Sequence, residues 1–420
     1  MEDIIECCAG TDVHKEILVV CTLTGPLNRK PQKELREFSA STAGLLELAT
    51  WLEELAITHV AMESTGIYWK PLWNLLASSD CDFNLMLANA RNVKNVPGHK
   101  TDRCDATWIA RLCRAGLIES SFVPPRDIEE LRELTRYRKR LIRDTTAEKN
   151  RIHKTLRRNN VGIDSCMADI FCVSGIALLE ALIDGEVITA DKLDLIIKGR
   201  TRSKIPQLLD ALNIGLSTHA RQMIQYSYKH LLYAEQLIME VEQDIDNHLV
   251  PYSEQKALLD TIPGIDKHAA AILIAELGVD MSVFPSAKHC ASWAGICPGN
   301  KESAGKKGRT KAIHGNKALR AILCESAWAS SRCRQTRISS RYWRLVKRMG
   351  EKKAILAIGH LLLVISYNAL KDLKPYNELG ADYFTQKPPH INLMIKKLLR
   401  AGYAVIPPEI QETNAETGPA

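Results

Sequence analysis

The sequence lacks three features that would each define a class of protein. Its 12 cysteines include no CxxC pair, which disfavours a zinc site and a disulfide framework, so we expect free thiols in a reducing compartment. The first residues, MEDIIECC, carry no positive charge, so we expect no secretory signal. The most apolar run, 354–370, is shorter than the ~20 residues that cross a membrane. It therefore predicts a buried helix rather than a membrane span.

Positive charge, by contrast, is concentrated in one region. The whole chain has a net charge of +7, whereas residues 287–353 hold 17 Lys and Arg against three acids. A surplus of this size is typical of a surface that binds a polyanion, most often a nucleic acid. A second stretch, 128–159, has 11 basic residues against five acids in a helical pattern. A solvated helical face is the alternative for that second stretch.

The N-terminal part of the chain alternates between strand and helix patterns. Residues 4–23 predict two strands joined by a tight turn at 12–15, and a third strand is expected at 33–39. The elements expected next are a helix at 42–55, a strand at 58–64, a helix around Tyr68 and Trp69, a strand at 83–87 and a helix from Asp102. This order predicts a mixed α/β sheet with the first strand near its centre.

Four acids fall where such a sheet places its chemistry. Asp12 and Glu63 end strands, and Asp102 and Asp105 share one face of a helix that Thr101 is expected to cap. Oxygen ligands without a matching His/Cys set suit Mg²⁺ or Mn²⁺, and two such ions about 4 Å apart would clamp a phosphodiester displacement. The alternative is that Asp102 is only a favourable first-turn charge and Asp105 a solvated residue.

Helical patterns dominate the rest of the chain after the proline pair at 124–125. A second long helix, expected at 220–249, has a seven-residue repeat that predicts a coiled coil, either antiparallel to the helix at 128–159 or used for dimerisation. The repeat consists of Ile224, Leu231, Ile238 and Ile245, and Ser227 and His248 interrupt it. Short helical fragments fill 161–217. Residues 257–278 resemble a helix-hairpin-helix whose turn at Gly264 would bind DNA phosphate; a purely structural hairpin is the alternative.

A stretch rich in glycine and lysine surrounds Ser303. A loop that embraces a phosphate needs glycines for close approach and basic side chains for charge, so Ser303 is a candidate nucleophile; ordinary turn chemistry is the alternative. The lesser candidates are Ser286, Ser292 and Ser326. We expect the following residues to contact nucleic acid: Lys100, Gly264, Lys306, Lys307, Arg309, Lys311, Lys317 and Arg320.

Taken together, five stretches resemble the DEDD-type insertion-sequence transposases, which have a RuvC-like N-terminal domain and a C-terminal serine transposase domain. They are GTDVHK, MESTGIYW, NVPGHKTDRCDATWIARL, IPGIDKHAAAILIAELG and WAGICPGNKESAGKKGRTKAIHGNKALR. The resemblance implies an α/β RNase H/RuvC-like domain at 1–123, an α-helical coiled-coil region at 124–250, and a mostly α-helical serine-bearing domain at 251–375. A C-terminal extension at 376–420 would end in a disordered segment from Pro407.

The resemblance also implies the activity, a transposase that cleaves and rejoins DNA. Asp12, Glu63, Asp102 and Asp105 would hold Mg²⁺ or Mn²⁺, and Ser303 would form a covalent bond to DNA. Implied partners are donor and target DNA, a noncoding bridge RNA, and further copies of the chain in a dimer or tetramer. The implied location is the cytoplasm of a bacterium or archaeon, at the nucleoid and not at a membrane. The rival readings are a RuvC-like metal-dependent nuclease without serine chemistry and a non-catalytic nucleic-acid-binding protein.

Overall fold

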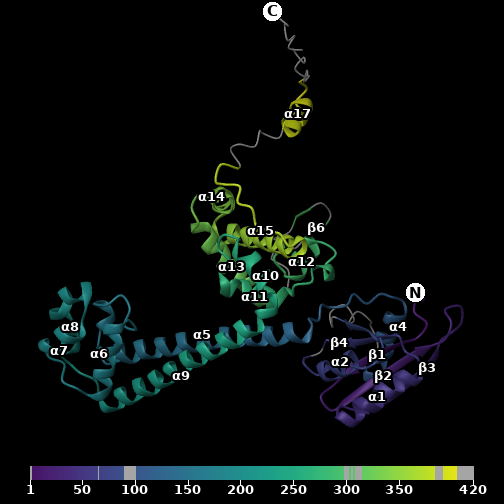
Figure 1. Ribbon diagram of the computed structural model, residues 1–420, viewed down its shortest axis with the longest axis horizontal. Helices are drawn as coiled ribbons and strands as arrows, with labels where there is room; N and C mark the ends of the chain where they lie inside the picture. Colours follow the sequence, from purple (N-terminus) through teal and green to yellow (C-terminus); the bar gives the residue numbers. More distant parts are fainter. Residues whose placement is uncertain are drawn as a thin grey trace, which may run out of the picture. The chain divides into compact units, whose positions relative to one another are not determined.

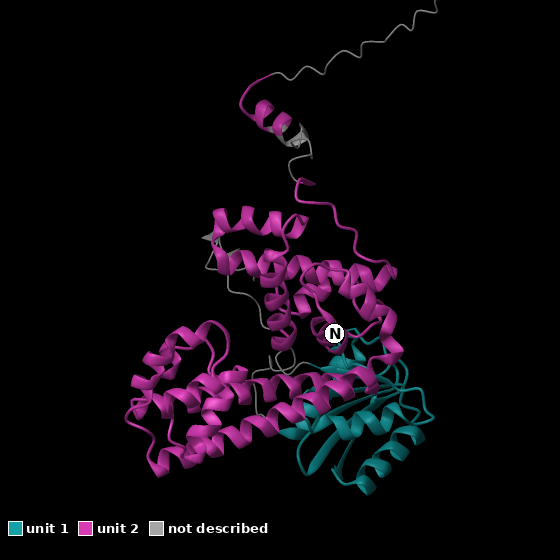
Figure 2. Cartoon of the chain, turned by 60° about the vertical axis from the view of Figure 1, so that its left-hand side comes forward, with its two compact units in different colours: residues 1–124 teal, residues 125–420 magenta. Residues whose placement is uncertain are grey.

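The computed structural model describes residues 2–64, 66–88, 101–297, 302–303, 306–307, 315–383 and 391–403. The chain forms two compact units, residues 1–124 and 125–420, coloured separately in Figure 2. The boundary falls between two prolines, where the backbone lacks two successive N–H donors and so joins neither unit by a regular ladder. The finer division at 250 and 375 stays a prediction.

The described residues of unit 1 form a five-stranded sheet and three helices. Its elements are β1 (Cys8–Val13), β2 (Ile17–Thr24), β3 (Gln32–Ser39), α1 (Thr42–Glu54), β4 (His59–Glu63), α2 (Trp69–Ala77), β5 (Asn84–Ala88) and α4 (Asp102–Arg114). The strand order is β3-β2-β1-β4-β5, with β2 antiparallel to β1 and β3, and β4 parallel to β1 and β5. The mixed α/β sheet with a central first strand is therefore confirmed, and each predicted element lies within a few residues of its expected place.

The two faces of this sheet have separate cores. Because successive residues of a strand point to opposite faces, Ala9 and Val13 of β1 pack toward α1 and α2, whereas Cys8 packs toward α4. The first core is made of large aliphatic and aromatic side chains, among them Leu48 and Trp51. The second is made mainly of small residues, so α4 can approach the sheet closely.

Two long helices, α5 (Arg126–Arg158) and α9 (Thr218–His248), lie side by side in unit 2 (Figure 1). Ion pairs join Arg138 to Glu242 and Lys149 to Glu235, so the residue numbers rise along one helix as they fall along the other. Of the two arrangements left open by the heptad pattern, the chain uses the antiparallel one. Ser227 interrupts the heptad pattern, but the adjacent Tyr228 is buried, so apolar packing between the two helices continues past this point.

The segment between these helices forms a small cap at one end of the pair. It contains η1 (Ile163–Ser165), α6 (Val173–Asp184), α7 (Ala190–Ile196), η2 (Gly199–Lys204) and α8 (Ile205–Leu212). Their apolar side chains share one core with Ile152 and Leu156 of α5 and with Ile224 and Leu231 of α9. The sequence predicts these fragments but not their position, because each is too short to bury its own apolar face.

The remainder of unit 2 is a helical domain around α15 (Glu351–Asp372). Its other elements are η3 (Val250–Tyr252), α10 (Ser253–Asp260), α11 (Lys267–Leu277), η4 (Met281–Val283), α12 (Ala287–Trp293), β6 (Glu302–Ser303), β7 (Lys306–Lys307), α13 (Lys317–Arg332) and α14 (Arg337–Met349). Helix α17 (Ile391–Arg400) follows further along the chain. Residues from Pro407 onward lie outside the described part of the chain.

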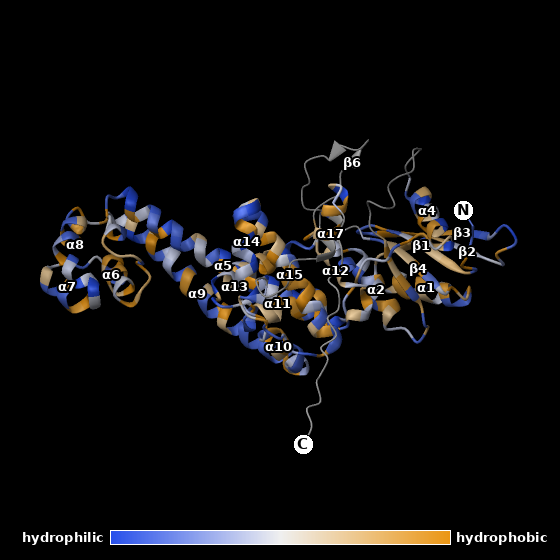
Figure 3. Cartoon of the chain, turned by 90° about the horizontal axis from the view of Figure 1, so that it is seen from above, coloured by the Kyte–Doolittle hydropathy of each residue, from blue (hydrophilic) through white to orange (hydrophobic). Residues whose placement is uncertain are grey.

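Helix α15 is long and apolar enough to cross a membrane, judged by length and composition alone. It contacts α10, α12, α13 and α14, and Ile358, Leu362 and Leu363 are fully buried. It is the core helix that its sequence predicts. Figure 3 shows the contrast with α5, which is largely hydrophilic in colour along its length.

Candidate metal and serine sites

Asp12 and Glu63 stand at the same edge of the sheet. Asp12 is the residue before last of β1, and Glu63 is the last residue of the parallel strand β4. The register pairs Thr11 with Met62, so the two acids follow at the same level. Alternation along each strand points both toward the face that α4 covers, together with Cys8 and Ala61. Asp12 is 5% and Glu63 8% exposed, so the sheet buries two carboxylates next to each other.

Helix α4 brings its N-terminus to this edge because it runs antiparallel to β1. Cys8 Sγ donates to the carbonyl of Ala110 at 3.5 Å, and the backbone N–H of Ile4 bonds the carbonyl of Arg114 at 2.9 Å. A Cβ atom on Gly10 would lie 2.1 Å from the backbone nitrogen of Ala110. Glycine at this position therefore allows the helix to lie directly on the strand. The sequence analysis missed Gly10, although a glycine inside a strand indicates close backbone approach.

The first turn of α4 presents Asp102 and Asp105. Thr101 has an extended backbone, and its side chain accepts a hydrogen bond from the N–H of Cys104, so it is the N-cap that the sequence predicts. Both acids lie in the first turn, where the helix dipole favours negative charge. The Asp102 side chain is 61% exposed, whereas Asp105 is half-buried.

His14 joins Asp12 and Asp102. Its Nε2 atom lies 3.2 Å from Asp12 Oδ2 and 3.5 Å from Asp102 Oδ2. Within the described part of the chain, these three residues form the one group of acids, histidines or cysteines whose ligand atoms all lie within 4.8 Å of one another. His14 was not predicted as part of the site, because the acids alone carried that prediction, although His14 follows Asp12 by two residues. Glu63 and Asp105 are outside this close group.

Electrostatic effects tie all four acids to one place. Burial raises the pKa of Asp12, His14 counteracts this shift, and Glu63, Asp102 and Asp105 raise the pKa further. A buried carboxylate among other acids is unfavourable in its charged form unless a cation joins it. Hard oxygen donors together with one imidazole nitrogen are a donor set that Mg²⁺ or Mn²⁺ accepts. The residues present therefore fit a divalent ion.

The site opens onto a depression on the surface of unit 1. Its volume is about 500 Å³, and its walls include His14, Lys15, Thr101 and Asp102. Arg103, also in the wall, is held by Glu37 at 2.8 Å. Asp102 and His14 thus belong both to the acid group around the buried Asp12 and to a surface that a large substrate can reach.

The segment with Ser303 is described only in part. Ser303 is in β6 and pairs with Lys306 of β7, and Glu302 pairs with Lys307, so the backbone forms a two-residue ladder that the sequence did not predict. The side chains of these four residues are outside the described part of the structure, as are Lys100, Arg309 and Lys311. The roles proposed for Ser303 and these basic residues stay predictions.

Gly264 lies in the tight turn between α10 and α11, with a φ of +87°. A Cβ atom there would lie 2.3 Å from Ser330 Oγ, and Ser330 Oγ donates to the carbonyl of Pro263 at 2.6 Å. The turn therefore packs on α13, which is a sufficient structural reason for glycine. Whether Gly264 also contacts phosphate stays a prediction.

Lys317 and Arg320 lie on the first turns of α13. Lys317 is exposed, whereas Arg320 is half-buried, and a Cβ atom on Gly295 would lie 2.5 Å from its Nη2 atom. Arg320 thus lies at the point where the segment with Ser303 leaves the helical domain. Contact of either side chain with nucleic acid stays a prediction.

The lesser serine candidates differ in their surroundings. Ser326 is 3% exposed inside α13. Ser286, immediately before α12, shares a 2.8 Å hydrogen bond between its Oγ atom and His289 Nδ1. Ser292 is exposed. Ser286 is the one of the three with a basic partner, and Ser326 is shielded from any large substrate.

Comparison with known families gives two matches. Residues 9–160 match a profile described as a transposase, of the DEDD type in IS110 elements, and residues 256–343 match the profile of the transposase IS116/IS110/IS902 family. The first match spans Asp12, Glu63, Asp102 and Asp105, and the second spans Ser303. Both regions of interest are therefore similar to transposases.

Two characterised proteins are similar to the chain. A pilin gene-inverting protein of Moraxella bovis is 30% identical over 190 residues, covering 44% of this chain and 54% of that protein. The pilin gene-inverting protein of Moraxella lacunata is 24% identical over 389 residues, covering 88% of this chain and 97% of that protein. The chain thus matches about half of the first relative and nearly all of the second.

Proposed function

The chain carries two domains of the IS110 transposase type and is a DNA recombinase or transposase, and from this premise we propose that it cleaves and rejoins DNA by phosphodiester transfer. The proposed machinery is a divalent metal held by Asp12, Glu63, Asp102 and Asp105, with Ser303 as nucleophile. Inversion of a gene, the activity in the names of both relatives, also requires DNA strands to be cut and rejoined.

The observation that supports this proposal most is the acid group at the edge of the sheet. Asp12 is buried near Glu63, Asp102 and Asp105, and its pKa is raised first by burial and further by these three acids. Such an arrangement is costly to the fold and is relieved when a cation binds. A bound Mg²⁺ (or Mn²⁺) would polarise the phosphodiester and stabilise charge on its oxygens. Asp12 and Glu63 fix the site to the sheet, and Asp102 presents it to the surface depression.

In the proposed reaction, Ser303 replaces one sugar oxygen on the scissile phosphorus. The Oγ–P bond forms, the P–O bond to the deoxyribose breaks, and the leaving sugar hydroxyl gains a proton. Attack by a hydroxyl of the partner strand then reverses the exchange and releases the serine. Because one phosphodiester replaces another at every stage, no external energy source is required.

The basic C-terminal region is the proposed nucleic-acid surface. Helix α14 contains no acidic residue, and within the described residues Arg341, Lys347 and Arg348 have no ion-pair partner. Trp343 on the same helix is 57% exposed beside Arg344. Unpaired basic side chains interleaved with an exposed aromatic ring suit a nucleic-acid backbone and its bases.

Further parts of the proposal rest on the family resemblance. They are recognition of donor and target DNA through a noncoding bridge RNA, action as a dimer or tetramer, and location in the cytoplasm at the nucleoid. In an oligomer, the acids of one copy and the serine of another would form one composite site.

The direct test is a denaturing-gel assay for a covalent protein–DNA adduct. The substrate is DNA spanning the abutted ends of the element that encodes the chain, supplied with the RNA transcribed from its flank and Mg²⁺. We expect an adduct with the unaltered protein and none with Ser303→Ala or Asp102→Ala. Ser286→Ala, which removes the serine paired with His289, is the matched control and should leave the adduct intact.

The rival functions give different results in the same assay. Metal-dependent cleavage without an adduct, unaffected by Ser303→Ala, would identify a nuclease that uses the acids alone. Binding of the DNA without cleavage under any metal condition would identify a non-catalytic nucleic-acid-binding protein. An adduct lost in Ser286→Ala and kept in Ser303→Ala would move the nucleophile to α12.

A further inference from the structure

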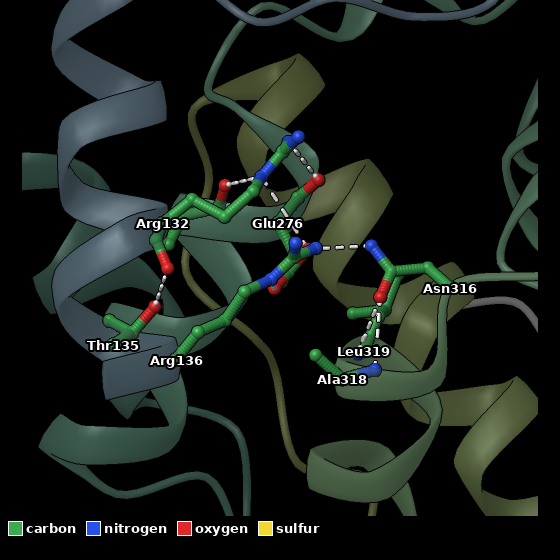
Figure 4. A network of polar contacts seen from close by, with 8 residues as sticks. Arg132, Thr135, Arg136, Glu276, Asn316, Ala318 and Leu319 are labelled. Atoms are coloured by element: carbon green, nitrogen blue, oxygen red, sulfur yellow. Dashed lines mark hydrogen bonds and ion pairs between the residues drawn. The ribbon is translucent and has the colours of Figure 1, made fainter. Parts of the chain in front are cut away.

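Unit 2 contains a fully buried carboxylate that the proposed reaction does not use. Glu276, at the C-terminal end of α11, is 0% exposed, and its partners come from α5 and from the residue that caps α13 (Figure 4). A buried charge of this kind is tolerated only where each oxygen has a partner, and removal of a partner leaves an uncompensated charge. Its position in the fold is therefore tightly specified.

Two arginines of α5 hold this carboxylate and its backbone. Arg136 Nε donates to Glu276 Oε1 at 2.8 Å, and its Nη2 donates to Oε2 at 2.9 Å, a two-pronged contact that fixes the plane of the carboxylate. Arg132 donates to the backbone carbonyls of Ala275 and Glu276, both at 2.9 Å. Two of the C-terminal carbonyls of α11, which have no partner inside the helix, are thereby satisfied.

The third partner of Glu276 is Asn316. Its Nδ2 atom donates to Glu276 Oε2 at 2.6 Å, while its Oδ1 atom accepts from the N–H groups of Ala318 and Leu319 at 3.0 and 3.1 Å. One side chain thus caps the start of α13 and binds the buried carboxylate. Asn316 comes directly after the stretch that holds Ser303, at the point where the chain re-enters the helical domain.

The other end of that stretch lies at the same place. A Cβ atom on Gly315 would lie 2.4 Å from the backbone nitrogen of Gly295, and one on Gly295 would lie 2.7 Å from Gly315 Cα. Gly295 has a φ of +68°, a conformation that other residues adopt only with strain. The stretch that contains Ser303 is therefore flanked by two glycines in contact.

We propose that Glu276 and Asn316 are positioning residues for the serine step. They fix to α5 the point at which the stretch with Ser303 joins α13, and this anchor would limit the placements open to Ser303. This inference rests on the proposed role of Ser303 as nucleophile. The physical reason is that attack on phosphorus requires a placement accurate to a fraction of an ångström, and an error of about 1 Å can lower the rate about 100-fold.

The test exchanges donor and acceptor at the Glu276–Asn316 contact. Asn316→Asp keeps an N-cap of equal quality on α13 but puts a carboxylate against the carboxylate of Glu276. Glu276→Gln supplies an amide that can donate, so the double variant restores one donor and one acceptor with the original total charge. Glu148→Gln is the matched control, since Glu148 is 3% exposed and binds Arg151 and His230 on the two long helices, away from the serine segment.

Adduct formation is measured at saturating DNA and at a temperature where every variant is folded. We expect Asn316→Asp to form adduct at least about tenfold more slowly and the double variant to recover to within about threefold. DNA affinity should stay unchanged in both, and Glu148→Gln should keep the full rate although it melts earlier. Trypsin should cleave within 301–311 faster in Asn316→Asp than in the unaltered protein.

Three results would overturn the inference. The first is a full adduct rate in Asn316→Asp while Ser303→Ala abolishes the adduct, which leaves the proposed function intact. The second is an equal loss of rate in Glu148→Gln, which makes the effect one of general stability. The third is unchanged trypsin cleavage in Asn316→Asp, which rejects the anchoring. If, in addition, the unaltered protein forms no adduct, the serine mechanism itself fails.

Discussion

Two buried carboxylates, one in each unit, have opposite surroundings. Asp12 in the sheet of unit 1 has three acids and one histidine around it, and its pKa is raised by burial and by those acids. Glu276 in unit 2 accepts three hydrogen bonds with its carboxylate and backbone from two arginines and a further one from Asn316. The same chemical group lies mainly among other acids in one place and is fully paired in the other.

The difference distinguishes a binding site from an anchor. A fold gains nothing from holding acids together, so a cation bound among them would explain a group such as that around Asp12. A fold does lose stability when a paired buried charge loses its partner, so Glu276 fixes α5, α11 and α13 to one another. Substitutions at the two positions should therefore have opposite effects on stability.

The largest expected effect is that of Asp12→Asn on activity. Loss of one carboxylate from the acid group should lower DNA cleavage by about 10³-fold or more, equivalent to about 4 kcal/mol of transition-state stabilisation. Without metal, the same variant should melt about 2–4 °C higher, because like charges no longer repel at a buried position. Cleavage assays and melting in EDTA measure both. Asp82→Asn, at an exposed acid of the same unit, should change neither.

Glu276→Ala should destabilise unit 2 by about 3–5 kcal/mol, because it removes the carboxylate that faces the largely buried Arg132 and leaves the amide of Asn316 without its acceptor. Denaturant unfolding of the whole protein, with and without the substitution, gives the free energy. Glu254→Ala, at an exposed acid of α10, should cost less than about 1 kcal/mol. Equal costs at the two positions would mean that the buried network does not stabilise the fold.

The prediction of the fold from sequence succeeded where periodicity is strong. The sheet of unit 1, the cap at Thr101 and the long helices follow from alternating or heptad patterns, which depend only on local sequence. The position of residues 161–217 does not, since their short helices share a core with distant turns of α5 and α9. The role of Glu276 was not predicted for the same reason, because the local sequence of α11 contains no information about the arginines of α5 that pair with it.

The site shows the same division between local and distant information. The four acids follow from their places at strand ends and in a helix start. The role of His14 can be predicted only if the turn after β1 is known to fold back toward Asp102. The role of Gly10 can be predicted only if α4 is known to cross β1. Both depend on contacts about 90–100 residues apart in the chain, between His14 and Asp102 and between Gly10 and Ala110.

Gly10→Ala tests how the acid group is assembled. The added Cβ atom would lie 2.1 Å from Ala110 N and 2.7 Å from Ala106 O, so α4 must move away from β1. We expect a loss of about 2–3 kcal/mol in stability and weaker Mg²⁺ binding, because Asp102 and Asp105 move with the helix. Unfolding and metal titration by calorimetry measure the two effects. Gly162→Ala, whose Cβ atom would meet nothing nearer than 3.7 Å, is the control.

The smallest expected effect concerns the basic surface of α14. Binding of DNA should weaken steeply with salt, and Lys347→Gln or Arg348→Gln should each lower the slope of log K against log[salt] by about one. Fluorescence anisotropy measures the affinity at salt concentrations from about 50 to about 200 mM, a range wide enough to resolve such a slope. Affinity that stays flat over this range would exclude α14 as a phosphate-binding surface.

The contact between Gly295 and Gly315 has a consequence for how such enzymes diversify. Two chain positions that already touch define a cassette: a segment of different length could join them without moving either flanking helix, provided that the buried Ile296 is kept. Reactive segments from related enzymes could therefore be grafted onto this helical domain as single exchanges. The requirement is that both glycines and the capping asparagine stay in place, so these three residues mark where a chimera should be joined.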